Sequence, residues 1–461
     1  MRCYDADSAE RGRMKITTPI VDFVDDYEKK DFSRLHMPGH KGKKHLGCEH
    51  LDITEIGGAD DLYSANGIIR ESEENASSLF HTAYTFYSTE GSTLAIKTML
   101  ALVAEHDGYI VASRNAHRSF LHACALLDLD VEWLYPDNFS HLCCCDVTAE
   151  KVKRVLSGAK KLPCAVYLTS PDYLGNILDI KSIARVCDDF GVPLVVDNAH
   201  GAYLAFCDPS MHPIALGAHM CCDSAHKTLP VLTGGAYLHV SEKADKKYIN
   251  NARSRLALFA STSPSYLILQ SLDLCNKTIA EGYVDKIETC IKKVSSTKEE
   301  LERNGISVYP SEPLKIVIET KKIGYIGTEL ADILREEKLE FEYADDDYIV
   351  AMFTPENDDR DYERLIRAFM NLEKKPAIAN DNIRPPKPQK VMSIRSAILS
   401  QSESVSAYNA EGRVCASPTV SCPPAVPIVM SGELISGEEI ALLKRYGIEK
   451  VEVVKGEECD V

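Results

Sequence analysis

The sequence has no long apolar run and no excess of positive charge. No stretch approaches the ~18 apolar residues that a membrane-spanning helix needs. The 461 residues carry 52 Lys+Arg against 69 Asp+Glu, a net charge of −17. We therefore predict neither nucleic acid nor a membrane as partner, because both attract basic surfaces. An acidic chain instead favours a cationic small molecule.

An apolar secretory leader is also missing from the first residues. The 16 cysteines are therefore predicted to be reduced thiols, since a chain of this length does not need disulfides to hold its core. We expect a cytoplasmic protein. Residues 1–13 are polar and have no apolar face, so deleting them should leave activity and melting temperature nearly unchanged.

The remaining composition is that of an ordinary globular protein, with 45% hydrophobic and 26% charged residues, and the length predicts two or three domains. Up to about residue 245, strand-like and helical runs alternate. This alternation predicts an α/β fold with a mostly parallel sheet that helices cover on both faces. The expected strands are 85–88, 109–112, 131–135, 165–168, 194–196 and 236–240.

Beyond the predicted sheet, the pattern indicates smaller α/β units. Strand-like runs at 315–320 and 348–353 alternate with helical ones and predict a layer of three or four strands. The prolines before residue 391 are typical of a linker. The predicted division is an N-terminal segment 1–50, a large domain 51–285, a small α/β domain 286–374, a linker 375–390 and a C-terminal domain 391–461.

One lysine stands in an unusual setting. Residues 222–235, C-D-S-A-H-K-T-L-P-V-L-T-G-G, place the amine of Lys227 beside two hydrogen-bonding side chains and a glycine pair. Such an amine can form a Schiff base with an aldehyde, and pyridoxal phosphate is the aldehyde cofactor that uses a lysine in this way. A lone lysine is usually an ordinary surface residue, so the hypothesis depends on partners elsewhere.

Two upstream features supply those partners. V-P-L-V-V-D at 192–197 predicts a buried strand ending in Asp197, and a carboxylate is needed to keep the pyridine nitrogen protonated; a helix N-cap is the alternative role. E-G-S-T at 90–93 precedes the helical run 94–105 and offers free N–H groups and hydroxyls to a phosphate. The Glu90 side chain is expected to point away from that phosphate.

With these pieces in place, the chain resembles the Orn/Lys/Arg decarboxylase family of fold-type-I pyridoxal phosphate enzymes, from about Thr18 to about Gly437. The seven motifs that carry the resemblance occur in the family's order. They are H-M-P-G-H-K-G (36–42), E-G-S-T (90–93), R-N-A-H-R-S (114–119), T-S-P-D-Y-L-G (169–175), D-N-A-H-G (197–201), S-A-H-K-T-L-P (224–230) and S-T-S-P-S-Y (261–266).

The resemblance implies a role for each matching residue. Lys227 is the Schiff-base lysine, Asp197 pairs with the pyridine nitrogen, and His117 stacks on the ring. His200 lies next to the ring face, and either His200 or Lys227 returns a proton to the α-carbon. The cofactor phosphate is assigned to Gly91, Ser92, Thr93, Ser224 and His226.

The resemblance also implies shared active sites. In the family the segment matching 251–275 comes from the neighbouring subunit and helps to close the phosphate site, so a monomer should be inactive. The N-terminal wing domain of the large decamer-forming members has no counterpart in this sequence. We therefore expect a homodimer or a higher homo-oligomer.

The implied reaction is decarboxylation of a basic L-amino acid, with arginine ahead of lysine or ornithine. Glu342 and Glu433 are candidate partners for the distal cation of the substrate, although each could equally be a solvated acid. Departures from the family pattern at Asn198, at P-P-A-V-P (423–427) and at S-G-E (431–433) leave the amino acid open. The alternatives are another fold-type-I enzyme, an aminotransferase or a lyase, or an inactive regulatory paralogue.

No metal site is predicted. H-L-C-C-C-D at 141–146 holds three adjacent cysteines, which point in different directions and lack the separated pairs typical of structural zinc. His36 and His40 have no further ligands nearby in the sequence.

Overall fold

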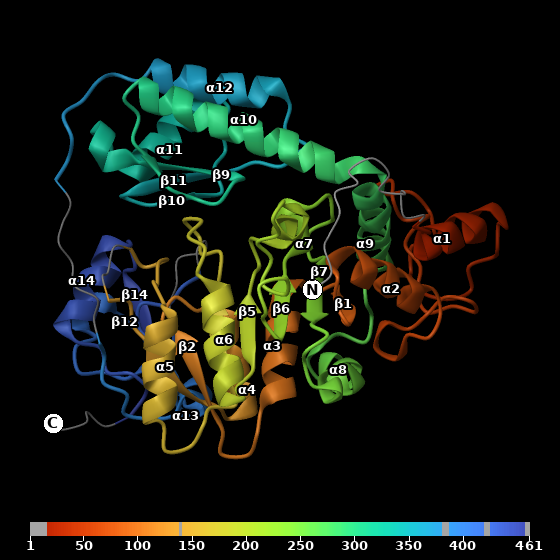
Figure 1. Cartoon of the computed structure of the whole chain (residues 1–461), viewed down its shortest axis with the longest axis horizontal. Helices are drawn as coiled ribbons and strands as arrows, with labels where there is room; N and C mark the ends of the chain where they lie inside the picture. Colours follow the sequence, from red (N-terminus) through yellow and green to blue (C-terminus); the bar gives the residue numbers. More distant parts are fainter. Residues whose placement is uncertain (1–15, 138–140, 380–386, 419–424, 457–461) are drawn as a thin grey trace, which may run out of the picture.

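The structure, a computed structural model, describes residues 16–137, 141–379, 387–418 and 425–456, so the predicted dispensable segment 1–13 lies outside it. It has the predicted α/β architecture, organised around a seven-stranded sheet of order β1-β7-β6-β5-β4-β2-β3 (Figure 1). Strands β2 to β6 run parallel. At one edge β7 pairs antiparallel with β6, and β1 pairs antiparallel with β7. The strands are β1 Tyr84–Ser88, β2 Tyr109–Ser113, β3 Asp130–Leu134, β4 Ala165–Thr169, β5 Leu194–Asp197, β6 Met220–Asp223 and β7 Ala236–Val240.

The six predicted strands are all present, and their ends differ from the prediction by at most one residue. Strand β6 was missed. Its sequence, M-C-C-D, contains no β-branched or aromatic residue, so neither composition nor alternation marks it as a strand. The strand forms because β5 and β7 flank it on both sides.

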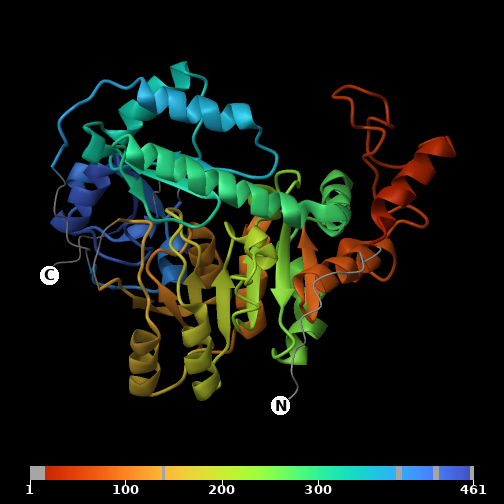
Figure 2. The ribbon, with the colours of Figure 1, turned by 45° about the horizontal axis from the view of Figure 1, so that its top comes forward.

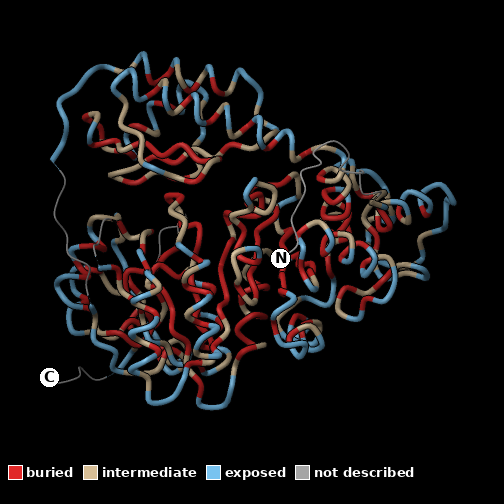
Figure 3. The backbone as a smooth tube through the Cα atoms, viewed as in Figure 1, coloured by how far each residue is buried: buried red, intermediate tan, exposed pale blue. Residues whose placement is uncertain are grey.

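Both faces of the sheet are buried, as expected for a largely parallel sheet. Neighbouring residues of one strand enter opposite cores: Val195 packs against the helices of one face and Val196 against those of the other. Figure 3 shows the strands as a buried layer between partly exposed helices. The first face is covered by α3 Gly91–Val103, α4 Arg118–Leu127 and α8 Lys246–Phe259, and the second by α5 Ala149–Gly158 and α6 Ile180–Phe190.

A smaller layer lies over one end of the large sheet (Figure 2). The sequence predicts three or four strands here, and the structure has four. They follow the order β10-β11-β9-β8, and all neighbours are antiparallel. The strands are β8 Val308–Tyr309, β9 Lys315–Glu319, β10 Tyr343–Ala344 and β11 Tyr348–Met352, and the helices are α10 Val284–Arg303, α11 Gly327–Glu336 and α12 Asp359–Met370.

The chain beyond residue 390 forms a third unit beside α5 and β2, drawn in blue in Figure 1. Its three-stranded sheet has the order β12-β14-β13 and its own small apolar core. The elements are α13 Ile394–Leu399, β12 Ser402–Ser406, β13 Cys415–Ser417, α14 Gly437–Arg445 and β14 Lys450–Val454.

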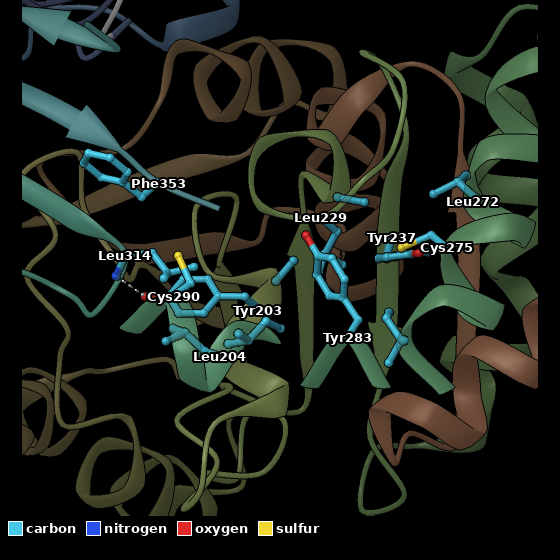
Figure 4. Packing of buried hydrophobic residues seen from close by; sticks show 14 of the residues in the cluster. Tyr203, Leu204, Leu229, Tyr237, Leu272, Cys275, Tyr283, Cys290, Leu314 and Phe353 are labelled. Atoms are coloured by element: carbon cyan, nitrogen blue, oxygen red, sulfur yellow. Dashed lines mark hydrogen bonds between the residues drawn. The ribbon is translucent and has the colours of Figure 1, made fainter. Parts of the chain in front are cut away.

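A continuous core joins the N-terminal helices, the large sheet and the small layer (Figure 4). Helix α9, Tyr266–Thr278, continues through a π-helical turn into α10, so one helical run crosses between the two layers. The phenol of Tyr203 accepts a 3.3 Å hydrogen bond from Leu314 N and donates to Glu312 at 3.1 Å. These contacts connect the small layer to the segment that follows β5 of the large sheet. Two helices complete this side of the molecule, α1 Pro19–Lys29 and α2 Ile68–Phe80.

The described helices include none that is long and apolar enough to cross a membrane. The described cysteines form no disulfide.

One ion pair, between Glu73 and Arg253, joins α2 to α8 in the interior. Removing one partner tests how much this pair stabilises the packing of α2. The Glu73 carboxylate is 0% exposed, pairs with Arg253 and accepts hydrogen bonds from Tyr87 N and Tyr84 Oη at 2.9 and 3.0 Å. We expect Arg253→Ala to lower the free energy of unfolding by about 3–5 kcal/mol, because it leaves a buried carboxylate without its cationic partner. Urea denaturation measures this loss.

The matched control is Arg70→Ala, which removes the exposed partner of Glu74 on the same helix. Exposed pairs of this kind contribute little, so the control should unfold with the wild type. Equal, small effects of both substitutions would contradict the account.

Candidate active site

A cavity opens at the carboxyl ends of the parallel strands, the edge where α/β folds place ligands. The ends of three of these strands, β2, β4 and β5, and the segments that follow them carry most of the lining side chains. The cavity is lined by Ser92, Asn115, His117, Cys143, Thr169, Pro171, Asp172, Tyr173, Asp197, Ala199, His200, Lys227 and Val426.

Lys227 enters this cavity from the short helix α7, Ala225–Thr228, which follows β6 directly. Its Nζ lies 2.9 Å from Nε2 of His200 and 5.6 Å from the centre of the Tyr173 ring. Burial lowers the pKa of the Lys227 amine, and the charges of Glu342 and Asp197 offset part of that effect. An amine with a lowered pKa is more often deprotonated and so a better nucleophile.

Burial also lowers the pKa of His200 well below its ordinary value, with the charge of Lys227 adding to the effect. The imidazole is therefore neutral at physiological pH. The ring of Tyr173 packs edge-on against it at 4.6 Å between centroids. A neutral histidine beside a lysine amine can hold that amine in place and can exchange a proton with it.

Asp197 is the last residue of β5, as predicted, and it is 3% exposed. Its Oδ2 accepts a 3.1 Å hydrogen bond from Tyr167 Oη, and its Oδ1 accepts one of 3.2 Å from Ala199 N. Burial raises the pKa of the Asp197 carboxyl. A carboxylate in such a place favours a cationic partner in the cavity.

His117 is the N-cap of α4, where its Nδ1 accepts a 3.2 Å hydrogen bond from Ser119 N. The ring is thereby held at the cavity wall. Burial, followed by the charge of Lys227, lowers the pKa of His117 to about 4. A neutral, fixed aromatic ring is suited to stacking against another ring.

The residues predicted for the phosphate lie at one end of the site. Gly91 N donates a 2.7 Å hydrogen bond to Gly234 O, and Nδ1 of His226 lies 3.0 Å from Gly235 O. Gly234 has φ +99°, and a Cβ there would stand 3.0 Å from the carbonyl oxygen of Thr89. The glycine pair thus lets the turn after Lys227 meet the first turn of α3.

Of this group only Ser92 lines the cavity itself. Thr93 follows it in the first turn of α3, and Ser224 is the N-cap of α7. Glu90 accepts a 2.7 Å hydrogen bond from Ser261 N and does not cap α3, so its carboxylate is turned toward that neighbouring loop.

The sequence reasoning gave no role to eight residues that line the cavity. Six of them lie in quoted motifs that gave them no role themselves: Asn115, Thr169, Pro171, Asp172, Tyr173 and Ala199. Cys143 was interpreted only as a loop thiol, and Val426 lies in a segment noted only for its departure from the family. No local pattern distinguishes these residues, because their function depends on which segments meet at the cavity.

Glu433 was wrong as a candidate partner for a substrate cation. Both of its carboxylate oxygens accept hydrogen bonds from the Arg114 guanidinium, at 2.9 and 2.8 Å, and Met430 N donates to it at 2.7 Å. The pair is nearly buried and joins the C-terminal unit to the end of β2. Arg114 already neutralises this carboxylate.

The three adjacent cysteines 143–145 do point apart. Cys143 faces the cavity, Cys145 Sγ contacts Leu134 O, and Cys144 Sγ lies 3.1 Å from Asn176 Nδ2. They hold no shared position for an ion.

Three buried polar side-chain atoms on the cavity wall have no hydrogen-bond partner in the described part of the chain: Asn115 Oδ1, Thr169 Oγ1 and His200 Nδ1. Such atoms cost free energy unless a ligand or water pairs with them. Together with the Lys227 amine and the Asp197 carboxylate, they fit a polar aromatic aldehyde with a ring nitrogen. Pyridoxal phosphate has this chemistry.

Comparisons with known proteins identify similar amino acid decarboxylases. An arginine decarboxylase of Bacillus subtilis is 28% identical over 464 residues, covering 92% of this chain and 93% of the relative. One of Bacillus anthracis is 27% identical over 466 residues, covering 93% and 92%. The solved constitutive lysine decarboxylase of Escherichia coli has a TM-score of 0.77 and covers 95% of this chain and 82% of its own, at 18% identity, which shows a common fold.

A family model described as Orn/Lys/Arg decarboxylase, major domain, matches residues 18–317. This match includes the whole seven-stranded sheet, with Asp197 and Lys227. The predicted family, fold class and cofactor are thereby confirmed: the chain belongs to the Orn/Lys/Arg decarboxylase family and is a pyridoxal-phosphate-dependent decarboxylase.

Proposed function

We propose that the chain decarboxylates a basic L-amino acid, arginine ahead of lysine or ornithine, with its cofactor on Lys227. The observation that carries this proposal is the Lys227–His200 contact in a cavity that also holds Asp197 and His117. Relatives named arginine decarboxylase over most of the chain length support the substrate class.

When bound, pyridoxal phosphate supplies an electron sink for the electron pair left by departing CO₂. Asp197 would hold the pyridine nitrogen in its protonated form, because a buried carboxylate is stabilised by a nearby cation. His117 would stack on the ring. Gly91, Ser92, Thr93, Ser224 and His226 would hold the phosphate at the start of α3, where the first N–H groups of a helix lack intrahelical acceptors.

Lys227 and His200 share the handling of protons. The Lys227 amine, held 2.9 Å from the neutral His200 imidazole, would carry the cofactor covalently, and its neighbour can exchange a proton with it. Either group can then return a proton to the α-carbon of the product. The burial of both excludes bulk water from this step.

Glu342 is the proposed partner of the distal cation of the substrate. It lies just before β10, in the small layer, and accepts a 3.1 Å hydrogen bond from Tyr173 Oη. The Tyr173 ring lines the cavity beside His200. The electrostatic effect of Glu342 on the Lys227 amine supports its position near the site. A planar guanidinium suits a bidentate carboxylate better than an ammonium does.

We also propose a homodimer or a higher homo-oligomer with shared active sites. Residues 261–263 are exposed beside Glu90, near the first turn of α3. Leu35 and Leu46 are 94% and 92% exposed on the long loop after α1. Large exposed apolar side chains of this kind favour a protein contact.

An aminotransferase or a lyase shares this fold, and fold alone does not separate these reactions. An inactive paralogue would be expected to lose the lysine or the aspartate. Family membership and the intact Lys227–Asp197 pair favour decarboxylation.

Borohydride reduction of the holoenzyme tests the role of Lys227. We expect the pyridoxyl group on Lys227 in peptide mapping, and no covalent label after Lys227→Ala. The nearby amine of Lys315, which is 1% exposed and contacts the Asp172 carbonyl, is the informative control. A pyridoxyl label on Lys315 in the wild type would show that Lys315, and not Lys227, binds the cofactor.

Asp197→Asn should leave the cofactor bound but lower kcat by roughly 100-fold or more, because the preorganised charge opposite the ring nitrogen is lost. Cofactor absorbance and steady-state turnover separate binding from chemistry. Turnover near the wild-type value would remove Asp197 from this role.

CO₂ release from arginine, lysine, ornithine and several neutral and acidic amino acids tests the substrate class. We expect the highest kcat/KM for arginine. Glu342→Gln should lower kcat/KM for the basic amino acids by about 10- to 100-fold, the cost of losing a charged hydrogen bond.

The matched control is Glu340→Gln, two residues earlier, where an exposed carboxylate pairs with Arg335. It should keep wild-type kinetics. Preference for an acidic or aromatic amino acid would overturn the substrate class, whereas preference for lysine or ornithine would change only the ranking.

A further inference from the structure

Asn198 stands between two residues of the cavity, Asp197 and His200, in the segment D-N-A-H-G. It is 0% exposed and is not among the described residues that line the cavity. Its backbone groups already have partners: Asn198 N donates a 3.0 Å hydrogen bond to Cys222 O, and Asn198 O accepts one of 2.8 Å from Gly201 N. The side chain can therefore make a further contact.

That contact is with Asp223, the last residue of β6. Asn198 Nδ2 donates a 2.7 Å hydrogen bond to Asp223 Oδ1, while Asn198 Oδ1 has no hydrogen-bond partner in the described part of the chain. The opposite orientation of the amide would place its oxygen against a carboxylate oxygen, so the NH₂ group must face Asp223. Because one buried oxygen is left unpaired in this way, the bond to Asp223 determines how the amide is oriented.

Asp223 is a fixed acceptor for this bond. It is 0% exposed, and its Oδ2 lies 3.0 Å from Nε2 of His212 and 3.2 Å from Nε2 of His239. Nδ1 of His212 accepts a hydrogen bond from Ile214 N, and Nδ1 of His239 contacts Thr85 Oγ1. Each ring therefore directs an N–H from Nε2 at Asp223. Burial alone would raise the pKa of Asp223, but its charge interactions and hydrogen bonds with the two histidines hold it well below its ordinary value.

The amide of Asn198 also packs against the backbone beside His200. A Cβ on Gly201 would collide with Asn198 Oδ1 and would stand 2.8 Å from Cδ of Pro171 on the cavity wall. No side chain could therefore separate the amide from the residue that follows His200. If the amide turned, it would push Gly201 aside and change the separation between Asp197 and His200.

The ionisable side chains around the Asn198–Asp223 pair come from β5, β6, β7 and the loop before β6: Asp197, Cys221, Cys222, Tyr237, His239 and His212. Burial raises the pKa of the two thiols and of the Tyr237 phenol well above their ordinary values and lowers the pKa of His239. From α2, the apolar ring of Phe80 packs against both histidines. A carboxylate at position 198 would thus face Asp223, which has no lysine or arginine as ion-pair partner in the described part of the chain.

We propose that Asn198 is a positioning residue, whose hydrogen bond to Asp223 sets the separation of Asp197 and His200 and requires an uncharged donor at position 198. The inference rests on the proposed function, in which Asp197 pairs with the pyridine nitrogen and His200 exchanges a proton with Lys227. A small displacement of groups that act on the reacting atoms lowers kcat. KM should change little, because Asn198 contacts neither Glu342 nor the cavity itself.

Asn198→Asp tests the proposal, since it keeps the size of the side chain and replaces the donor by an oxygen. Two facing carboxylates raise the pKa of one of them, and only the protonated form can donate to Asp223. Relative to the wild type, we expect kcat of this variant to fall about 10- to 100-fold as the pH rises, with little change in KM. The absorbance of the bound cofactor should change over the same pH range. The deficit in melting temperature should widen as the pH rises, because a raised folded-state pKa loses stability in that direction.

The double variant Asn198→Asp with Asp223→Asn restores the bond with donor and acceptor exchanged, and its amide oxygen can still accept from both histidines. It should recover kcat to within a few-fold of the wild type and lose the pH dependence of the single variant. Asn276→Asp on α9 is the matched control. That amide is also 0% exposed, donates to Tyr87 Oη at 2.7 Å and has an unpaired Oδ1. Its loss should lower the melting temperature but leave kcat unchanged.

Wild-type kcat in Asn198→Asp at every pH would overturn the proposal, and so would a double variant that does not fold or does not recover kcat. If Asn198→Asp alone does not fold, the double variant therefore still decides. An equal loss of kcat in Asn276→Asp would also overturn it, because kcat would then follow stability alone. If the wild type binds its cofactor but releases CO₂ from no amino acid, the proposed function fails, while cofactor absorbance and melting temperature across the same variants still test the role of Asn198.

Discussion

A lysine amine held out of water, 2.9 Å from a neutral histidine, sets the requirements for the rest of this site. Burial favours the uncharged forms of both Lys227 and His200, and only the uncharged amine can attack a carbonyl. The surrounding fold must therefore bury Lys227 and His200 and still leave each of them a hydrogen-bond partner. It does so by placing α7 directly after β6, so that Lys227 reaches over the strand ends toward Asp197 on β5.

The three sheets each contribute one side of that enclosure. The large sheet supplies Lys227, His200 and Asp197, and the small layer places Glu342 against Tyr173. The C-terminal unit brings Val426 to the cavity. Its position is fixed by the Arg114–Glu433 pair and by the hydrogen bond from Arg118 N to Ala425 O. Because R-N-A-H-R is one continuous segment, the residues that anchor this unit flank His117, which lines the cavity.

Much of this arrangement could be predicted from sequence, for a physical reason. A helix start, a carboxylate at a strand end and a lysine beside glycines are each visible in a few consecutive residues, so Ser92, Asp197 and Lys227, which line one cavity, could be singled out without a structure. Strand β6 could not, because M-C-C-D lacks a pattern of its own and forms a strand through its neighbours. Glu433 was misjudged because its partner, Arg114, lies 319 residues away. The contact between Tyr173 and Glu342 spans 169 residues and was equally out of reach.

A crystal structure of the chain with pyridoxal phosphate tests the central claim most directly. The account predicts continuous density between Lys227 Nζ and the cofactor, with the ring nitrogen at hydrogen-bond distance from Asp197 and the His117 ring stacked on one face. A cofactor bound in that cavity with its ring nitrogen away from Asp197, or bound through another lysine, would contradict it.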